Sequence, residues 1–258
     1  MGTDHSRPGT GLEPFETVLT QRNGQGQPFV IVGGQAANIW AAYYLPHEPR
    51  LEMHFPFTSK DLDLIGTGAE AAQVAEAIGW YLSAPAFGGG PVEAVLSSQP
   101  QGAGLKVEFL REIKGVPHET VMAYARENVV RVAGGNTPQR VRVLDPVLLM
   151  AGKIRNAVDI EQNQPEKPRQ DVKHVAMLAL CVSHFLGDMQ AQAVGSKQQR
   201  EICGHYVTML ASLKNTFSAR QFEARHPGII LWPELIPQTV RPMAFDPQIQ
   251  SSLQQLCG

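Results

Sequence analysis

The chain has 258 residues, of which 43% are hydrophobic and 18% charged, as in an ordinary globular protein with a sizeable core. Proteins that grip long nucleic acid carry a basic excess or stripe, and the net charge of −2 argues against such a partner. The three cysteines form no CxxC pair, which argues against a zinc site and fits a reducing cytoplasm. No stretch approaches the run of about 20 apolar residues that spans a membrane, so we expect a cytoplasmic protein without a membrane partner.

The first half of the chain alternates strand and helix patterns. Residues 1–27 predict a flexible tail followed by a short helix. Residues 29–32 are a compact β-branched apolar run, typical of a buried strand, and apolar residues at helical spacing follow over 36–44. A further helix is predicted at 68–80, and further strands at 60–65, 92–96, 105–113, 129–132 and 140–143. This order predicts a mixed sheet with helices packed on it.

The pattern becomes helical near residue 144. Apolar residues recur at helical spacing behind Pro146, which suits a first helical turn, and again over 172–186 and 202–210. We therefore expect an α+β fold in two parts. A mixed-sheet domain would occupy residues 28–144, and a helical domain residues 145–258.

Asp61 and Asp63 are the first candidates for a functional site. They lie two residues apart in a predicted strand, so both carboxylates project from one face while Leu62 and Leu64 point into the core. Two carboxylates held close together repel each other, and a hard divalent cation relieves that repulsion. The alternative is a polar strand face with two solvated aspartates.

Two more elements carry candidate residues. Gly33 and Gly34 lie where a strand meets a helix, so backbone N–H groups there could converge on an anion; the alternative is a tight turn. Their spacing fits neither a dinucleotide fingerprint nor a Walker loop. Glu108 lies with Lys106 on the polar face of a later strand, where the alternative is a Lys/Glu surface ladder.

Together these elements resemble the DNA polymerase β-type nucleotidyltransferase superfamily. The shared arrangement is a strand, two glycines and a helix, then a strand with D-x-D, then a later strand with one acidic residue. Within the superfamily the chain looks most like the abortive-infection type nucleotidyltransferase toxins and their uncharacterised bacterial relatives. The resemblance covers residues 28–115 by motif and 145–175 more loosely. It implies a nucleotidyltransferase-like sheet domain followed by the helical one.

The resemblance also implies roles for individual residues. Gly33 and Gly34 would contact the phosphates of a nucleoside triphosphate (NTP). Asp61, Asp63 and Glu108 would be the catalytic carboxylates and would hold two Mg²⁺ (or Mn²⁺) ions. Glu108 would also help to activate the hydroxyl of the acceptor.

Two lysines complete the expected nucleotide site. Lys60 lies beside the D-x-D pair, and Lys153 lies on the first helix after the sheet, where the family tends to carry a lysine. Such a lysine could reach a triphosphate as a mobile point charge. The alternative for Lys153 is a solvated position on the helix face.

The sequence departs from the family's pattern at three places. Residues 46–58 lengthen the connection between the glycines and the D-x-D strand, and they look like an insertion. The third carboxylate is Glu108 where Asp is commoner. Downstream, Arg169, Gln170 and Asp171 stand where the toxins often show a Lys-Asp pair followed by another Asp, and His174 nearby is expected to be a packing or surface residue.

Two functions remain open. The first is a metal-dependent nucleotidyltransferase that moves a nucleoside monophosphate (NMP) from an NTP to a hydroxyl-bearing acceptor, which could be a small molecule, a protein or an RNA end. The second is a non-catalytic relative that binds a nucleotide or a partner protein through the same cleft. A toxin–antitoxin component fits either. The three carboxylates favour the first function, whereas Glu108 and the altered downstream motif favour the second.

Overall fold

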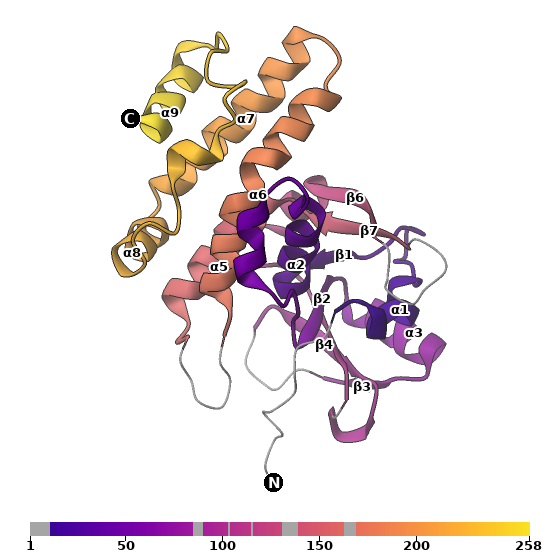
Figure 1. Cartoon of the computed structure of the whole chain (residues 1–258). Helices are drawn as coiled ribbons and strands as arrows, with labels where there is room; N and C mark the ends of the chain where they lie inside the picture. Colours follow the sequence, from indigo (N-terminus) through magenta and orange to yellow (C-terminus); the bar gives the residue numbers. More distant parts are fainter. Residues whose placement is uncertain (1–10, 85–89, 103, 115, 131–138, 163–168) are drawn as a thin grey trace.

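The computed structural model describes residues 11–84, 90–102, 104–114, 116–130, 139–162 and 169–258. Within them the chain forms a seven-stranded mixed sheet in the order β3-β4-β5-β2-β1-β7-β6, with helices packed on and beside it (Figure 1). The predicted mixed sheet with packed helices is therefore confirmed. The strands are β1 (Val30–Val32), β2 (Asp61–Ile65), β3 (Tyr81–Ser83), β4 (Val92–Ser97), β5 (Lys106–Leu110), β6 (Ala125–Val130) and β7 (Gln139–Leu144).

Helices are present wherever the apolar spacing was regular, including the one behind Pro146. The α-helices are α1 (Glu16–Leu19), α2 (Gly33–Tyr44), α3 (Gly68–Ile78), α4 (His118–Ala123), α5 (Pro146–Asp159), α6 (Asp171–Gln192), α7 (Ser196–Lys214), α8 (Phe217–Arg225) and α9 (Pro247–Cys257). Short 3₁₀ helices occupy Glu13–Phe15, Pro49–His54, Pro100–Gly102 and Trp232–Leu235.

Several elements were not predicted from the sequence. All three side chains of β3 are exposed, so no apolar alternation distinguishes this edge strand. The short or peripheral helices α4, α8 and α9 were also missed. The strand expected over 105–113 ends at Leu110, and Ile113 makes only an isolated bridge to Val116. Residues 1–10 of the expected tail lie outside the described residues.

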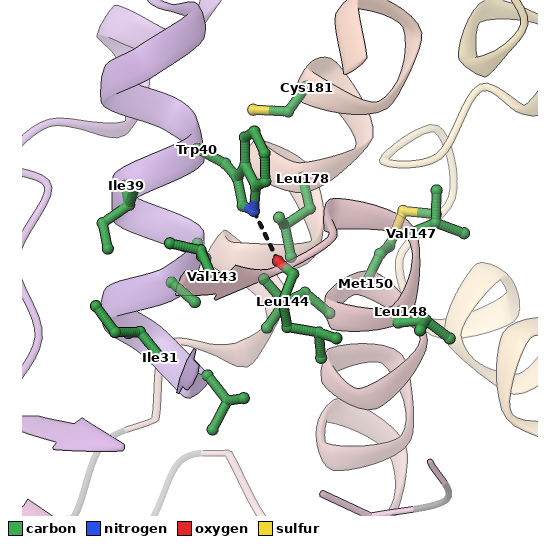
Figure 2. Packing of buried hydrophobic residues seen from close by; sticks show 14 of the residues in the cluster. Ile31, Ile39, Trp40, Val143, Leu144, Val147, Leu148, Met150, Leu178 and Cys181 are labelled. Carbon is green, nitrogen blue, oxygen red and sulfur yellow. Dashed lines mark hydrogen bonds between the residues drawn. The ribbon is translucent and has the colours of Figure 1, made fainter. Parts of the chain in front are cut away.

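The helices α2, α5 and α6 pack against one another beside the central strands. Trp40 of α2 is buried among them, and its indole N–H donates to the carbonyl oxygen of Leu144 at 2.8 Å (Figure 2). A buried indole usually finds such a partner, because an unpaired N–H is costly. Since Leu144 ends β7 just before α5 begins, this bond ties α2 to the start of α5.

Helix α6 is long and apolar enough, by length and composition, to cross a membrane, and among the described residues it is the one helix that meets this test. Half of the relevant window is buried inside the protein, against α2, α5 and α7 among others. A core helix passes the same test, so packing accounts for its apolar character.

The start of α5 is fixed by a buried carboxylate. Asp145 is fully buried, and its Oδ1 accepts from the backbone N–H of Leu148 at 2.9 Å. Its Oδ2 accepts from the hydroxyl of Tyr206 on α7 at 3.2 Å, and that hydroxyl accepts from Arg126 on β6 at 2.7 Å. Burial raises the pKa of Asp145 to about 6, although the hydrogen bonds from Leu148 and Tyr206 lower it. The network therefore joins β6, α5 and α7.

Asp145→Ala should lower the free energy of unfolding by about 1–3 kcal/mol, because it removes the cap of α5 and leaves the Tyr206 hydroxyl without its buried acceptor. Urea denaturation of both proteins measures the loss. The control is Asp246→Ala, which removes the same kind of cap from the peripheral helix α9. An equal loss in the two variants would show that the network adds nothing beyond capping.

Candidate functional site

The three candidate carboxylates lie on two neighbouring strands. Strand β2 runs parallel to β5, and in their register Asp61 is opposite Lys106 and Asp63 is opposite Glu108. Asp61, Asp63 and Glu108 are half-buried, whereas the alternating side chains on both strands, Leu62, Leu64, Val107 and Phe109, are buried. The structure therefore places the three carboxylates on one face, with Asp63 and Glu108 directly paired across the strands.

The surroundings of Asp63 disfavour its charge. Burial is the main cause that raises the pKa of Asp63 to about 7, and repulsion by Glu108 and Asp61 adds to it. Lys153 and the backbone N–H of Gly34 act in the opposite direction without cancelling the effect. The ionised form of Asp63 is thus unfavourable in the protein alone, and a cation beside it would stabilise that form.

Gly33 allows the carboxylate of Asp63 to lie against the start of α2. Its φ is +66°, and a Cβ built there would lie 1.7 Å from the Oδ2 atom of Asp63. Helix α2 begins at this residue; Val32 before it has no capping side chain, and the carboxylate of Asp63 accepts from the backbone N–H of Gly34. The β1–α2 junction is thus more than a tight turn, because its glycine makes room for a candidate site residue.

Gly34 faces a second part of the site. A Cβ there would lie 2.6 Å from the Oγ atom of Ser59 and 3.1 Å from the Cε1 atom of His174. The junction therefore approaches the residue before Lys60 on one side and helix α6 on the other. Neither Ser59 nor His174 was a candidate from the sequence, because nothing in their spacing links them to the glycines.

Lys153 is buried and is not the solvated helix-face residue that the alternative interpretation describes. Its Nζ donates to the Oδ1 atom of Asp171 at 2.9 Å, and the Nε of Arg169 donates to Oδ2 at 2.6 Å. Burial opposes the ionised carboxylate of Asp171, but the two cations outweigh it and hold its pKa below the usual value. Asp171 thus fixes both cations at the edge of the carboxylate face.

Two cavities meet at this edge. The smaller, of about 160 Å³, is lined by polar groups that include Gly34, Ser59, Lys60, Asp61 and His174. The larger, of about 550 Å³, is lined on its other side by apolar side chains that include Val92, Leu110, Ile113, Leu149 and Ile160. Both are lined by Asp63, Glu108, Lys153 and Arg169. The carboxylates and cations therefore lie between a small polar space and a larger apolar one.

Among the described residues, no group of three or more His, Cys, Asp or Glu side chains is arranged to hold a metal ion. The three carboxylates therefore share a face without forming a closed set of ligands in the protein alone. The available donors are carboxylate oxygens, the type that Mg²⁺ and Mn²⁺ prefer, and the repulsion at Asp63 is of the kind that such an ion relieves.

No protein-family model and no curated protein sequence matches this chain. Its function therefore has to be inferred from these side chains and cavities. Buried cations beside a cluster of carboxylates can bind an anionic group and a divalent cation at the same time.

Gly33→Ala should destabilise the protein more than Gly26→Ala. Both glycines have positive φ, which costs an alanine about 1–2 kcal/mol, but a Cβ at Gly26 meets open space whereas one at Gly33 meets the carboxylate of Asp63. The free energies of unfolding of the single variants, and of Gly33→Ala combined with Asp63→Ala, test the contact.

The loss caused by Gly33→Ala should shrink when Asp63 is already Ala, because the clashing carboxylate is then absent. Additive losses in the double variant would show that the two residues do not touch.

Proposed function

We propose that this protein is a metal-dependent nucleotidyltransferase, which transfers an NMP from an NTP to a hydroxyl-bearing acceptor. The observation that carries the proposal is the pairing of Asp63 with Glu108 across β2 and β5, on one face with Asp61 and beside the buried cation Lys153. Transfer of a nucleotide needs these two kinds of group together, because the metal ions and the phosphates carry opposite charges.

The order of elements supports the resemblance to the DNA polymerase β-type superfamily. Strand β1 leads through Gly33 into α2, the D-x-D pair lies on β2, and the third carboxylate lies on β5. On this proposal residues 28–144 form the nucleotidyltransferase-like domain and residues 145–258 the helical domain. Lys153 and Asp171, from α5 and α6, would complete the site between them.

The donor atoms present are of the type that the proposed metal ions prefer. Asp61, Asp63 and Glu108 would hold Mg²⁺ or Mn²⁺, which supplies positive charge to the attacking and leaving oxygens of an in-line displacement. Lys153, held by Asp171, would place its charge near the phosphates. Lys60 and Gly34, which line the polar cavity, would contact the same group.

Glu108 would act on the acceptor. Its carboxylate would take the proton from the acceptor hydroxyl as that oxygen bonds to the α-phosphorus and the bond to the β-phosphate breaks, releasing pyrophosphate. The larger cavity, which Glu108 also lines, would give the acceptor or the nucleoside access to this reaction. We also propose a cytoplasmic location, in keeping with the three cysteines, none of which forms a disulfide.

One observation favours a non-catalytic relative that binds a nucleotide or a partner protein in the same cleft. The described carboxylates do not form a ready set of three metal ligands. Such a protein, like the enzyme, could belong to a toxin–antitoxin pair. Binding of Mg-NTP without any transfer of nucleotide would distinguish it from the enzyme.

A panel of the four NTPs with Mg²⁺ or Mn²⁺ tests the metal site by thermal shift. A nucleotide at about 100 times its Kd should stabilise the fold by about 2.7 kcal/mol. Asp61→Asn and Asp63→Asn should each abolish the metal-dependent part of this stabilisation and leave the fold intact. Asp246→Asn, at the start of α9, is the matched control and should behave as the wild type.

The stabilisation by the metal ion in this panel should increase with pH. The pKa of Asp63 is raised to about 7, so the neutral side chain is the form that stabilises the fold without metal. This stabilisation is lost as the pH rises through 7. Metal binding needs the ionised form, so stabilisation by the cation should be larger at pH 8 than at pH 6. An unchanged metal effect in the double Asn variant would refute the site.

Glu108→Gln should keep most of the affinity for NTP and lower transfer of labelled nucleotide about 100-fold or more, because a general base acts in the transition state. Transfer from α-labelled NTP to a cell lysate or to the protein itself is the measurement. Glu76→Gln, an exposed position on α3, is the control. Wild-type protein that binds Mg-NTP and transfers nothing would support the non-catalytic alternative.

A further inference from the structure

His174 has no role in the function described so far, yet its position is unusual. It lies on α6 and is only 4% exposed, and neither ring nitrogen has a hydrogen-bond partner in the described protein. His174 lines the small polar cavity beside Gly34, but its nitrogens have almost no exposed surface, so the ring must rotate for one of them to reach a ligand there. A neutral imidazole carries one donor and one acceptor, and leaving both unpaired in the interior destabilises the fold. An apolar side chain of similar size would avoid this cost.

The cations beside His174 disfavour a metal ion at its ring and favour an anion there. Burial is the main cause that lowers its pKa to about 3, and the neighbouring cations Lys153, Lys173 and Arg169 add to the effect, although Asp171 opposes it. Cations that disfavour a proton on the ring also disfavour a metal ion bound to it. The same cations attract a negatively charged group.

Other polar groups around the cavity suit the same kind of ligand. Gly34, in the first turn of α2, lines the cavity, and a helix N-terminus of this length attracts anions. The hydroxyl of Ser59 and the ammonium group of Lys60 line the cavity. His174 thus completes a set of hydrogen-bonding groups around a small space.

The small volume of the polar cavity limits which part of a nucleotide it can hold. Its volume of about 160 Å³ is below the range of about 300–1,000 Å³ for pockets that hold drug-sized ligands, whereas the neighbouring cavity of about 550 Å³ lies within it. The two cavities share Asp63 and Glu108, where the α-phosphate would react. The nucleoside would then lie on the larger side, and the far end of the phosphate chain on the smaller.

We propose that His174 donates a hydrogen bond to the terminal phosphate of the bound NTP, and that the polar cavity between the start of α2 and α6 holds this phosphate. The inference rests on the function proposed above and adds a specificity residue to it. His174 acts on the part of the ligand that an NMP lacks. It therefore sets the preference for a triphosphate over a monophosphate.

His174→Leu tests the proposal, because it removes both nitrogens and keeps a similar volume. The affinity for Mg-NTP should fall about 10- to 100-fold, as expected for a lost hydrogen bond to a charged group, while the affinity for the matching NMP should stay within about twofold. The thermal midpoint of the ligand-free protein should hold or rise, since a buried unpaired polar group has gone. Calorimetric titration of the four NTPs and their monophosphates measures both affinities.

The control is His184→Leu, the same change ten residues later on the same helix. His184 hydrogen-bonds to Glu48 at 3.4 Å and lines a different cavity, so this variant should lose stability and keep its NTP affinity. His174→Asn and His174→Gln place an amide near the position of one ring nitrogen or the other. At least one of them should recover part of the NTP affinity, which a purely space-filling role would not predict.

Four results would overturn the proposal, and they differ in whether the proposed function also fails. Unchanged NTP affinity in His174→Leu, with wild-type protein that binds NTP, would leave the proposed function standing and make His174 a packing residue. Equal losses for NTP and NMP, or no recovery with either amide, would place its role away from the terminal phosphate. Wild-type protein that binds no nucleotide with Mg²⁺ or Mn²⁺ would overturn the proposed function and this inference together.

Discussion

The close approach of Asp63 to Gly33 is the constraint on which the rest of the site depends. Strand β2 pairs with β1 so that Asp63 lies opposite Val32, the last residue before α2 begins. The carboxylate occupies the space of a missing Cβ, and the backbone adopts a positive φ to allow it. On the other side of β2, the parallel register brings Glu108 beside Asp63. A glycine at this junction thus brings a helix N-terminus and two carboxylates together.

A second arrangement supplies the positive charge. Two cations on a buried surface would repel each other, and Asp171 compensates by accepting from both Lys153 and Arg169. The bonds hold the cations in place, so less side-chain freedom is lost when an anion binds. Because α5 begins at the capped and buried Asp145 and packs closely on α6, Lys153 and Asp171 are held in the core, and Arg169, just before α6, is partly exposed.

The part of the site that lies on the sheet could be predicted from the sequence, because alternation in a strand fixes which side chains share a face. That rule placed Asp61 with Asp63 and put Glu108 on the polar face of its strand, and the Gly-Gly pair marked the β1–α2 junction. The apolar pattern did not predict the contribution of α6, although the resemblance drew attention to the region of Asp171. His174 and Asp171 lie more than a hundred residues from the glycines, and no periodic pattern in a core helix shows which polar residue will face a distant cavity.

The site contains two groups whose surroundings favour ligands of opposite charge. Asp63 is held in a place where its charge is disfavoured, which a cation would correct, whereas His174 lies unpaired among cations, which an anion would correct. Each group lowers the stability of the fold, and a structural role does not explain why it is there. Both groups line the same small cavity, so one ligand that carries a divalent cation on a phosphate chain would relieve both at once. A metal ion alone or a phosphate alone would relieve only one, and for this reason we favour a metal-bound nucleotide over either.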